Sequence, residues 1–210
     1  MHGSAQELES YKRELILQYL IPAFGSLVTF YEQKIEDIVS CSLLQKMVRN
    51  QYMESPGPGL TGFLWFSIEA MCHSYFFNSQ KNMLCGTNIY KKRALIFNGD
   101  SLINGLDRQD YVQILEDGFV LSISFPDVLQ LMNKYKDLDQ AMRLFTHAQG
   151  MYFRQQGVLR EIPSLERVRR LRTEHAAFVS CATKEVQAIH AHLSVKQYYN
   201  KIKQLETESR

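Results

Sequence analysis

The sequence predicts an α+β protein in which helices flank an antiparallel β-barrel or sandwich. Apolar residues recur at helical spacing near the N-terminus, over residues 6–19 and 27–39, with Pro22 and Gly25 between the two segments. Short segments rich in aromatic and β-branched residues, separated by turn signals, then fill residues 42–123. A heptad pattern runs from 138 to 159 and leads into a basic region with helical spacing.

The middle region has turn signals at short intervals. They are the loop of residues 55–59 (Ser-Pro-Gly-Pro-Gly), Asn98-Gly99 and Asp117-Gly118. Because closely spaced turns leave room only for short strands, the pattern is typical of a small antiparallel barrel or sandwich. The predicted strands are residues 42–48, 51–54, 62–69, 71–77, 83–90, 93–97, 111–115 and 119–123.

The heptad segment is predicted to be one long helix. Its apolar and small residues alternate in spacings of three and four, which is how one helix packs along another. We therefore predict a dimer spine between a sensing and an output domain, while an ordinary core helix with one buried stripe is the alternative. The predicted dimer interface consists of Leu138, Ala141, Phe145, Ala148, Tyr152 and Leu159.

Further helices are predicted around this segment. Phe125-Pro126-Asp127 opens one that runs through Met132, with a break near Asp137. Pro163 forces a stop, after which Ser164 is expected to cap a helix carrying Leu165, Val168 and Leu171. Two short helices, 183–190 and 195–205, complete the chain and are joined by a turn at Leu193-Ser194.

The distribution of charged, apolar, cysteine and histidine residues limits the classes of function that the sequence predicts. From Leu138 onward the chain carries 12 Lys and Arg against 7 Asp and Glu, while the remainder carries 12 against 15, which hints that the C-terminal part meets a polyanion. The absence of a long apolar run or a leader pattern predicts a cytoplasmic protein with no membrane partner, and the four cysteines lack metal-binding spacing. His190 and His192 have no third ligand at a recognisable spacing. With no nucleophile motif either, we expect neither an enzyme nor a cofactor.

Several short sequence motifs occur in the order found in one protein family. They are residues 53–57 (Met-Glu-Ser-Pro-Gly), 66–70 (Phe-Ser-Ile-Glu-Ala), 97–100 (Phe-Asn-Gly-Asp), 111–117 and 120–124. Together with the order of elements they resemble Crp/Fnr-type transcription regulators, of the divergent kind found in Bacteroidetes. The resemblance implies a jelly-roll, cyclic-nucleotide-binding-like sensor domain (1–137), a dimerisation helix (138–162) and a helix-turn-helix DNA-binding domain (163–210).

The resemblance also implies a ligand site, although this chain departs from the pattern. The family holds a cyclic phosphate with a Gly-Glu pair and an Arg, and Arg108 occupies the Arg position. The Gly-Glu pair is missing, and Asn104 and Gly105 are the nearest candidates in its place. These departures argue against cAMP, so the barrel is empty, self-filled or specific for another small molecule. Arg108 is therefore interpreted first as a solvated loop residue, with the ligand contact as the other interpretation.

The predicted DNA-reading helix follows the turn at Leu193-Ser194. By resemblance, Ala188, Tyr198 and Ile202 are buried, while Gln187, Ala191 and His192 depart from the pattern. His192 stands where a glycine with positive φ is usual. The DNA-binding candidates are Lys196, Gln197, Tyr199, Asn200 and Lys203. The sequence thus predicts a homodimeric, Crp/Fnr-like regulator that binds DNA in response to an effector. The alternative is a small-molecule or protein-interaction module whose helix-turn-helix does not bind DNA.

Overall fold

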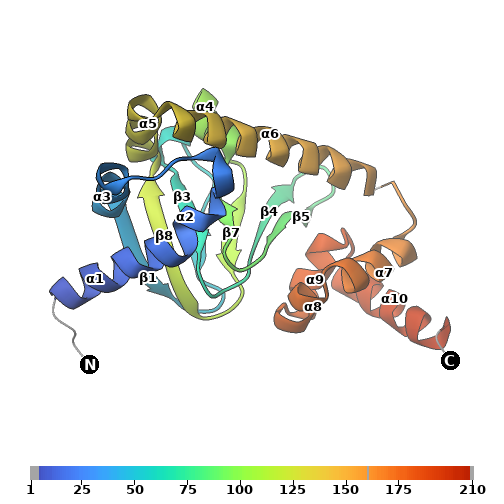
Figure 1. Cartoon of the computed structure of the whole chain (residues 1–210). Coiled ribbons are helices and arrows are strands. Elements are labelled where there is room, and N and C mark those ends of the chain that lie inside the picture. Colours follow the sequence, from blue (N-terminus) through green and yellow to red (C-terminus); the bar gives the residue numbers. More distant parts are fainter. Residues whose placement is uncertain (1–4, 160, 209–210) are drawn as a thin grey trace.

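The computed structural model describes residues 5–159 and 161–208, with the backbone alone for residues 5 and 153–159. Helices of the N-terminal half cover one side of a two-sheet sandwich, and α6 (Lys136–Leu159) crosses from the sandwich to a C-terminal group of helices (Figure 1). The predicted α+β class is confirmed. None of the described helices is both long and apolar enough to span a membrane.

The helices and strands have the following bounds. The α-helices are α1 (Ala5–Leu15), α2 (Ile21–Ala23), α3 (Glu32–Cys41), α4 (Gly99–Asn104), α5 (Phe125–Lys134), α6, α7 (Ser164–Glu174), α8 (Ala176–Cys181), α9 (Lys184–His190) and α10 (Val195–Glu208). A π-helical turn, η1 (Ile16–Leu20), and two 3₁₀ turns, η2 (Gly25–Leu27) and η3 (Gly59–Thr61), complete the helical elements. The strands are β1 (Ser42–Met47), β2 (Tyr52–Glu54), β3 (Phe63–Ser67), β4 (Cys72–Asn78), β5 (Met83–Tyr90), β6 (Leu95–Ile96), β7 (Tyr111–Ile114) and β8 (Gly118–Ser124).

The strands form two antiparallel sheets with the orders β1-β8-β3-β6 and β2-β7-β4-β5. This alternation between two four-stranded sheets is the jelly-roll arrangement. Of the two predicted architectures, the closed barrel is wrong, because no ladder joins the sheets within the described residues. The edge strands β2 and β6 are three and two residues long, and each pairs only within its own sheet among the described residues.

The sheet β1-β8-β3-β6 is buried on both faces. Alternate side chains of β3 and β8 divide between two cores: Leu64 and Leu121 pack against the N-terminal helices, whereas Trp65 and Val120 pack between the sheets. Three layers therefore follow one another: helices, this sheet, and the sheet β2-β7-β4-β5. The outer face of the last sheet turns toward the C-terminal helices and carries His73 and Tyr75.

Helix α6 uses one face for the core of its own chain. Leu138, Ala141 and Met142 are 4%, 1% and 0% exposed and lie in the core beneath the N-terminal helices. Phe145 is half-buried against Phe24, with ring centroids 5.8 Å apart. The prediction that Leu138 and Ala141 form a dimer interface is therefore wrong, because a heptad pattern does not reveal whether the partner helix belongs to the same chain.

The region around Asn98-Gly99 also differs from its prediction as a tight turn. The Asn98 side chain accepts a hydrogen bond from the Ser101 amide at 2.9 Å and caps α4. A Cβ on Gly99 would lie 2.4 Å from a carbon of Thr146, so the glycine lets α4 lie directly on α6. Helix α8 was not predicted either, and Pro163, rather than Ser164, takes the cap position of α7.

The C-terminal helices have a small core of their own. Val168, Phe178, Ala188 and Tyr198 are almost fully buried there, and the sheets contribute Met71 and Leu115 to the same cluster. The burial of Ala188, Tyr198 and Ile202 confirms the apolar pattern predicted for α9 and α10.

Gln187 is a buried polar residue in that core, 1% exposed. Its Nε2 donates to the carbonyls of Val179 and Ala182 at 2.9 and 2.8 Å, and its Oε1 accepts from the Tyr198 hydroxyl at 2.8 Å. A buried amide is tolerable only when both ends are hydrogen-bonded, as here. Gln187 therefore fixes α8, α9 and α10 relative to one another.

We expect Gln187→Leu to lower the free energy of unfolding by about 1–3 kcal/mol, because it leaves the Tyr198 hydroxyl and two carbonyls unpaired. Urea denaturation measures the loss. Gln187→Leu with Tyr198→Phe should recover part of it, since the unpaired hydroxyl is gone. The exposed Gln204→Leu is the control and should change stability by less than about 0.5 kcal/mol. Equal effects of the two leucine variants would contradict the role given to Gln187.

Candidate functional site

A small cavity lies between the two sheets, at the place where the resemblance implies a ligand. Its volume is about 30 Å³, enough for about two water molecules. A pocket for a nucleotide-sized ligand spans roughly 300–1,000 Å³. The cavity is lined by Glu54, Phe63, Ser74, Tyr90, Ile96, Phe97, Asn98, Arg108, Asp110, Val112 and Phe125.

Arg108 lines this cavity but is bound to the chain itself. Its Nε pairs with Glu54 Oε2 at 3.0 Å, with side chains 11% and 10% exposed. Its Nη1 donates to the carbonyls of Pro58 and Gly59 and to the Thr61 hydroxyl. The interpretation of Arg108 as a solvated loop residue is therefore wrong. The guanidinium that would hold a phosphate holds the 55–61 loop instead.

Apart from Arg108, the charged side chains that line the cavity are the acidic Glu54 and Asp110. Glu54 Oε1 accepts hydrogen bonds from the Phe63 amide and the Trp65 indole, both at 2.9 Å. Burial raises the pKa of Glu54 above its ordinary value, and burial likewise raises the pKa of Asp110. A negatively charged ligand would meet two carboxylates here, so the cavity in this conformation is suited neither in size nor in charge to a cyclic nucleotide.

The other two ligand-binding candidates do not line the cavity. Asn104 is exposed, and its amide donates to Asp100 at 3.3 Å. Gly105 ends α4 with a φ of +69°, a conformation that favours glycine. Both residues shape the end of a short helix.

The five DNA-binding candidates are all exposed on α10, on the side away from Tyr198 and Ile202. Lys196, Lys201 and Lys203 give the first turns of α10 a positive charge, while Glu206 and Glu208 lie in its last turn. A helix of 14 residues is about 21 Å long, which suits the major groove of DNA.

The turn before α10 is held by local hydrogen bonds. Ser194 Oγ accepts from the Gln197 amide at 3.2 Å, and Gln197 Oε1 accepts from the Ser194 amide at 3.0 Å, which is a reciprocal capping pair. Gln197 therefore has a structural partner as well as an exposed position. His192 has a φ of +52°, a conformation that usually favours glycine.

A buried polar chain joins the sheets to the C-terminal helices. Gln113 Nε2 donates to the Asn50 carbonyl at 2.7 Å, so its Oε1 accepts from His73 Nε2 at 3.1 Å. That leaves His73 Nδ1 to accept from His190 Nε2 at 3.2 Å. His73 is completely buried, and burial lowers its pKa to about 4, so the chain is neutral at physiological pH. We call this contact of β4 and β5 with α9 the joint.

Sequence reasoning missed the joint. His73 and His190 are 117 residues apart, and neither lies in a motif. The backbone of β5 closes the other side of the joint, since a Cβ on Gly86 would lie 2.4 Å from His190 Nδ1. A glycine in the middle of a strand signals a close approach of this kind without naming the partner.

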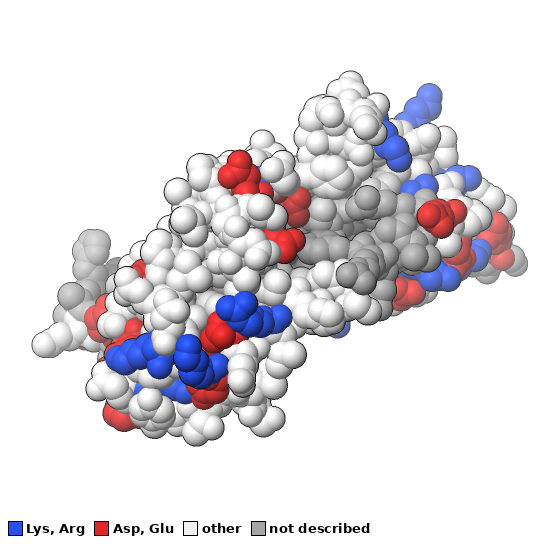
Figure 2. Space-filling view, turned by 90° about the horizontal axis from the view of Figure 1, so that it is seen from above, with Lys and Arg blue, Asp and Glu red and all other residues white. Residues whose placement is uncertain are grey.

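The exposed face of α6 differs from the predicted dimer interface. Ala148 is exposed and Tyr152 is half-buried at the joint, whereas the side chain of Leu159 lies outside the described residues. Leu144 and Met151, 53% and 44% exposed, flank Ala148 at heptad spacing. Figure 2 looks down on this side of the molecule, where large uncharged areas separate scattered charges of both signs.

The sequence matches no protein-family model and no curated protein. The fold is similar to that of the c-di-GMP-responsive global regulator CLP from Xanthomonas campestris, with a TM-score of 0.67, 12% identity, and coverage of 84% of this chain and 92% of that one. A Eubacterium rectale protein described as a Crp/Fnr-family transcriptional regulator has a TM-score of 0.70, 9% identity and 85% coverage of each chain. A cyclic nucleotide-binding domain protein from Listeria monocytogenes has a TM-score of 0.61, 10% identity, and coverage of 90% and 91%.

These similarities cover 84–90% of this chain. The chain therefore has the fold of Crp/Fnr-type regulators, as the sequence phrases predicted. The identities are too low to transfer any ligand or site residue from the similar proteins.

We expect Arg108→Met to lower the free energy of unfolding by about 3–5 kcal/mol, because it leaves the Glu54 carboxylate buried without its cation. The loss should be larger at pH 8 than at pH 5. A buried carboxyl group whose pKa is raised binds its proton more readily in the folded state, so its burial costs least at low pH. Urea titrations at the two pH values measure this difference.

The exposed Arg143→Met is the control for this experiment, because Arg143 forms only a surface pair with Asp139. A loss that is the same for both variants, or that grows as the pH falls, would contradict the proposed burial of Glu54.

Proposed function

We propose that the protein is a homodimeric transcription regulator that reads DNA with α10. The observation that carries the proposal is the two-sided character of α10. Tyr198 and Ile202 anchor the helix on its own domain, while lysines and amides occupy its exposed first turns. The fold shared with Crp/Fnr-type regulators supports the same general kind of function.

The polar side chains of α10 suit direct readout of base pairs. Asn200 has the chemistry to bond an adenine edge with its amide, and Gln197 has it too if its bond to Ser194 opens. Lys196 and Lys203 supply charge for phosphates on either side of the groove. Tyr199, 43% exposed, offers a hydroxyl and a ring at the same surface.

The dimer is proposed to form through the exposed side of α6. Leu144, Ala148 and Met151 are spaced by four and three residues, which is a heptad seam of the kind predicted but rotated away from the buried stripe. To read two adjacent major grooves, the two copies of α10 in such a dimer would have to lie about 34 Å apart.

Regulation by cAMP is not part of the proposal. The cavity between the sheets is about 30 Å³ and faces Glu54 and Asp110, so DNA binding is expected to be independent of cAMP. An unidentified small-molecule effector is compatible with the fold.

The first test is binding to a library of genomic fragments at several salt concentrations. We expect a subset of fragments to bind more tightly than random DNA. Replacing Lys196 and Lys203 together with Gln should weaken binding to all fragments and reduce the salt slope by about 2, because each lost phosphate contact removes about one unit. Asn200→Ala should instead relax sequence preference by about 1–3 kcal/mol at one base pair.

The matched control replaces Lys46 and Lys81 with Gln, which removes the same charge from exposed positions on the sheets. Adding cAMP should change neither affinity nor preference. The regulator proposal fails if no fragment is preferred over random DNA, or if the control pair weakens binding as much as the α10 pair.

The second test concerns the interface. We expect Leu144→Lys with Met151→Lys to convert a dimer into a monomer, since the charges would meet across the two-fold axis. Multi-angle light scattering measures the mass. The monomer's own stability should change little, because both side chains are exposed. Leu8→Lys with Leu43→Lys, at positions 53% and 58% exposed, is the control. A dimer that survives the α6 variant would place the interface elsewhere.

A further inference from the structure

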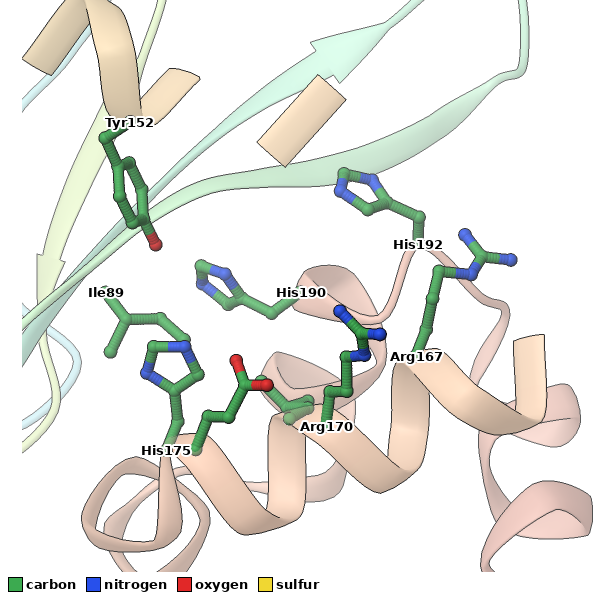
Figure 3. A pocket seen from close by; sticks show the side chains of 9 residues that line it. Ile89, Tyr152, Arg167, Arg170, His175, His190 and His192 are labelled. Atoms are coloured by element: carbon green, nitrogen blue, oxygen red, sulfur yellow. The ribbon is translucent and has the colours of Figure 1, made fainter. Parts of the chain in front are cut away.

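A second cavity lies beside the joint, where the end of α6, β5, α7 and α9 meet (Figure 3). We call it the joint cavity. Its volume is about 50 Å³, enough for about three to five water molecules, which is comparable to one phosphate group. It is lined by Ile89, Tyr152, Arg167, Arg170, Leu171, Glu174, His175, His190 and His192.

Arg167 is an unusual member of this lining. Its Nε is buried and has no hydrogen-bond partner among the residues that the structure describes. Burial lowers the pKa of its guanidinium below the ordinary value. Arg167 as a whole is half-buried, but a buried N–H without a hydrogen-bond partner is costly, and native structures generally provide such a group with an acceptor.

The other polar side chains that line the joint cavity are mostly hydrogen-bond donors. One of them is a carboxylate. Arg170 rises from α7 beside Arg167, although its Nε already pairs with Glu166 at 3.2 Å. Glu174 is the acidic group in the lining. In Figure 3 the hydroxyl of Tyr152 points toward His190 and His175, and His192 lies above Arg167.

The imidazoles beside the cavity are held in their neutral form, chiefly by burial. Burial lowers the pKa of His190 well below its ordinary value, and the neighbouring His73, His192 and His175 lower it further. Burial also lowers the pKa of His175. An anion among these rings would favour their protonated forms and turn a set of neutral imidazoles into donors.

We propose that the joint cavity binds the phosphate group of a small phosphorylated molecule, with Arg167 as its principal partner. The guanidinium offers a planar pair of N–H donors to an oxyanion, and Arg170, Tyr152 and the histidines surround the remaining oxygens. The cavity touches both the sheet and the C-terminal helices, so its occupant biases how the two meet. This proposal concerns binding at the joint and does not depend on DNA binding by α10.

A free molecule, rather than the backbone of DNA, is the expected source of the phosphate. The cavity is recessed between β5, α6 and two helices, whereas the five exposed DNA-binding candidates all lie on α10, no residue of which lines it. Its volume accommodates one phosphate group but not a duplex strand with its neighbouring sugars.

The test is a thermal unfolding and calorimetric titration of the whole chain with inorganic phosphate, at constant ionic strength set by chloride. We expect a saturating concentration to raise the midpoint temperature by about 2–4 °C. Arg167→Met should abolish this rise and weaken phosphate binding at least tenfold. Without phosphate the variant should be no less stable than the wild type, because it removes a buried Nε–H that has no hydrogen-bond partner among the described residues. A purely structural role for Arg167 would predict the opposite.

Arg143→Met, which removes one exposed guanidinium from α6, is the matched control and should leave the response to phosphate unchanged. Arg170→Met is the second site variant and should weaken binding even if Arg167→Met does not fold. The proposal is overturned if phosphate does not stabilise the wild type, or if neither site variant alters the response. It is also overturned if a short DNA duplex binds through Arg167 while phosphate and a sugar phosphate do not.

Sulfate provides an independent test, because its charge is constant over the relevant pH range. The groups that face His190 are His73 from β4, Tyr152 from α6, Arg167, Arg170 and Glu174 from α7, and His175 and His192 from the adjoining turns. We expect sulfate to bind at least threefold more tightly at pH 6.5 than at pH 8, with uptake of protons. Weaker binding at the lower pH would place the anion away from the imidazoles and overturn the site.

Discussion

The packing of the first half of α6 onto the sandwich determines where the rest of the molecule lies. Leu138, Ala141 and Met142 bury their side chains in the N-terminal core, and Gln149 donates to the Phe97 carbonyl one turn before the helix leaves the sheets. A buried aliphatic side chain contributes roughly 1.5–3 kcal/mol, so this stripe holds the helix firmly. The direction of α6 then decides the position of the joint, the exposed seam and α10.

Much of the fold follows from local patterns, and what does not follow depends on distant partners. The strand β5 and the buried positions of α10 were predictable, because alternation and helical spacing record which side of an element is buried. Asn98-Gly99 was misread because the same two residues suit a hairpin turn and a helix cap, and only Thr146 on α6 distinguishes them. Burial of a heptad residue does not identify which helix covers it.

In the candidate functional sites, too, features set by the local sequence were predictable, and features set by distant partners were not. The side-chain types on α10 follow from the resemblance, whereas Arg108 was misread because its partner Glu54 lies 54 residues earlier, beyond a proline-rich loop. The His73–His190 contact had no signal in either segment, since each histidine alone reads as an isolated polar residue. Pairing across domains is a property of tertiary packing, and a single sequence does not record it.

Gly86 allows the β5 backbone to lie in direct contact with His190 at the joint. The backbone of β5 at Gly86 lies directly against the His190 ring, so no β5 side chain separates the strand from this residue of α9. A shift of the β4–β5 hairpin would therefore press on the His190 side chain and, through it, on α9. A side chain in place of one of the two hydrogens on the Gly86 α-carbon would collide with the His190 ring and push the strand and the helix apart.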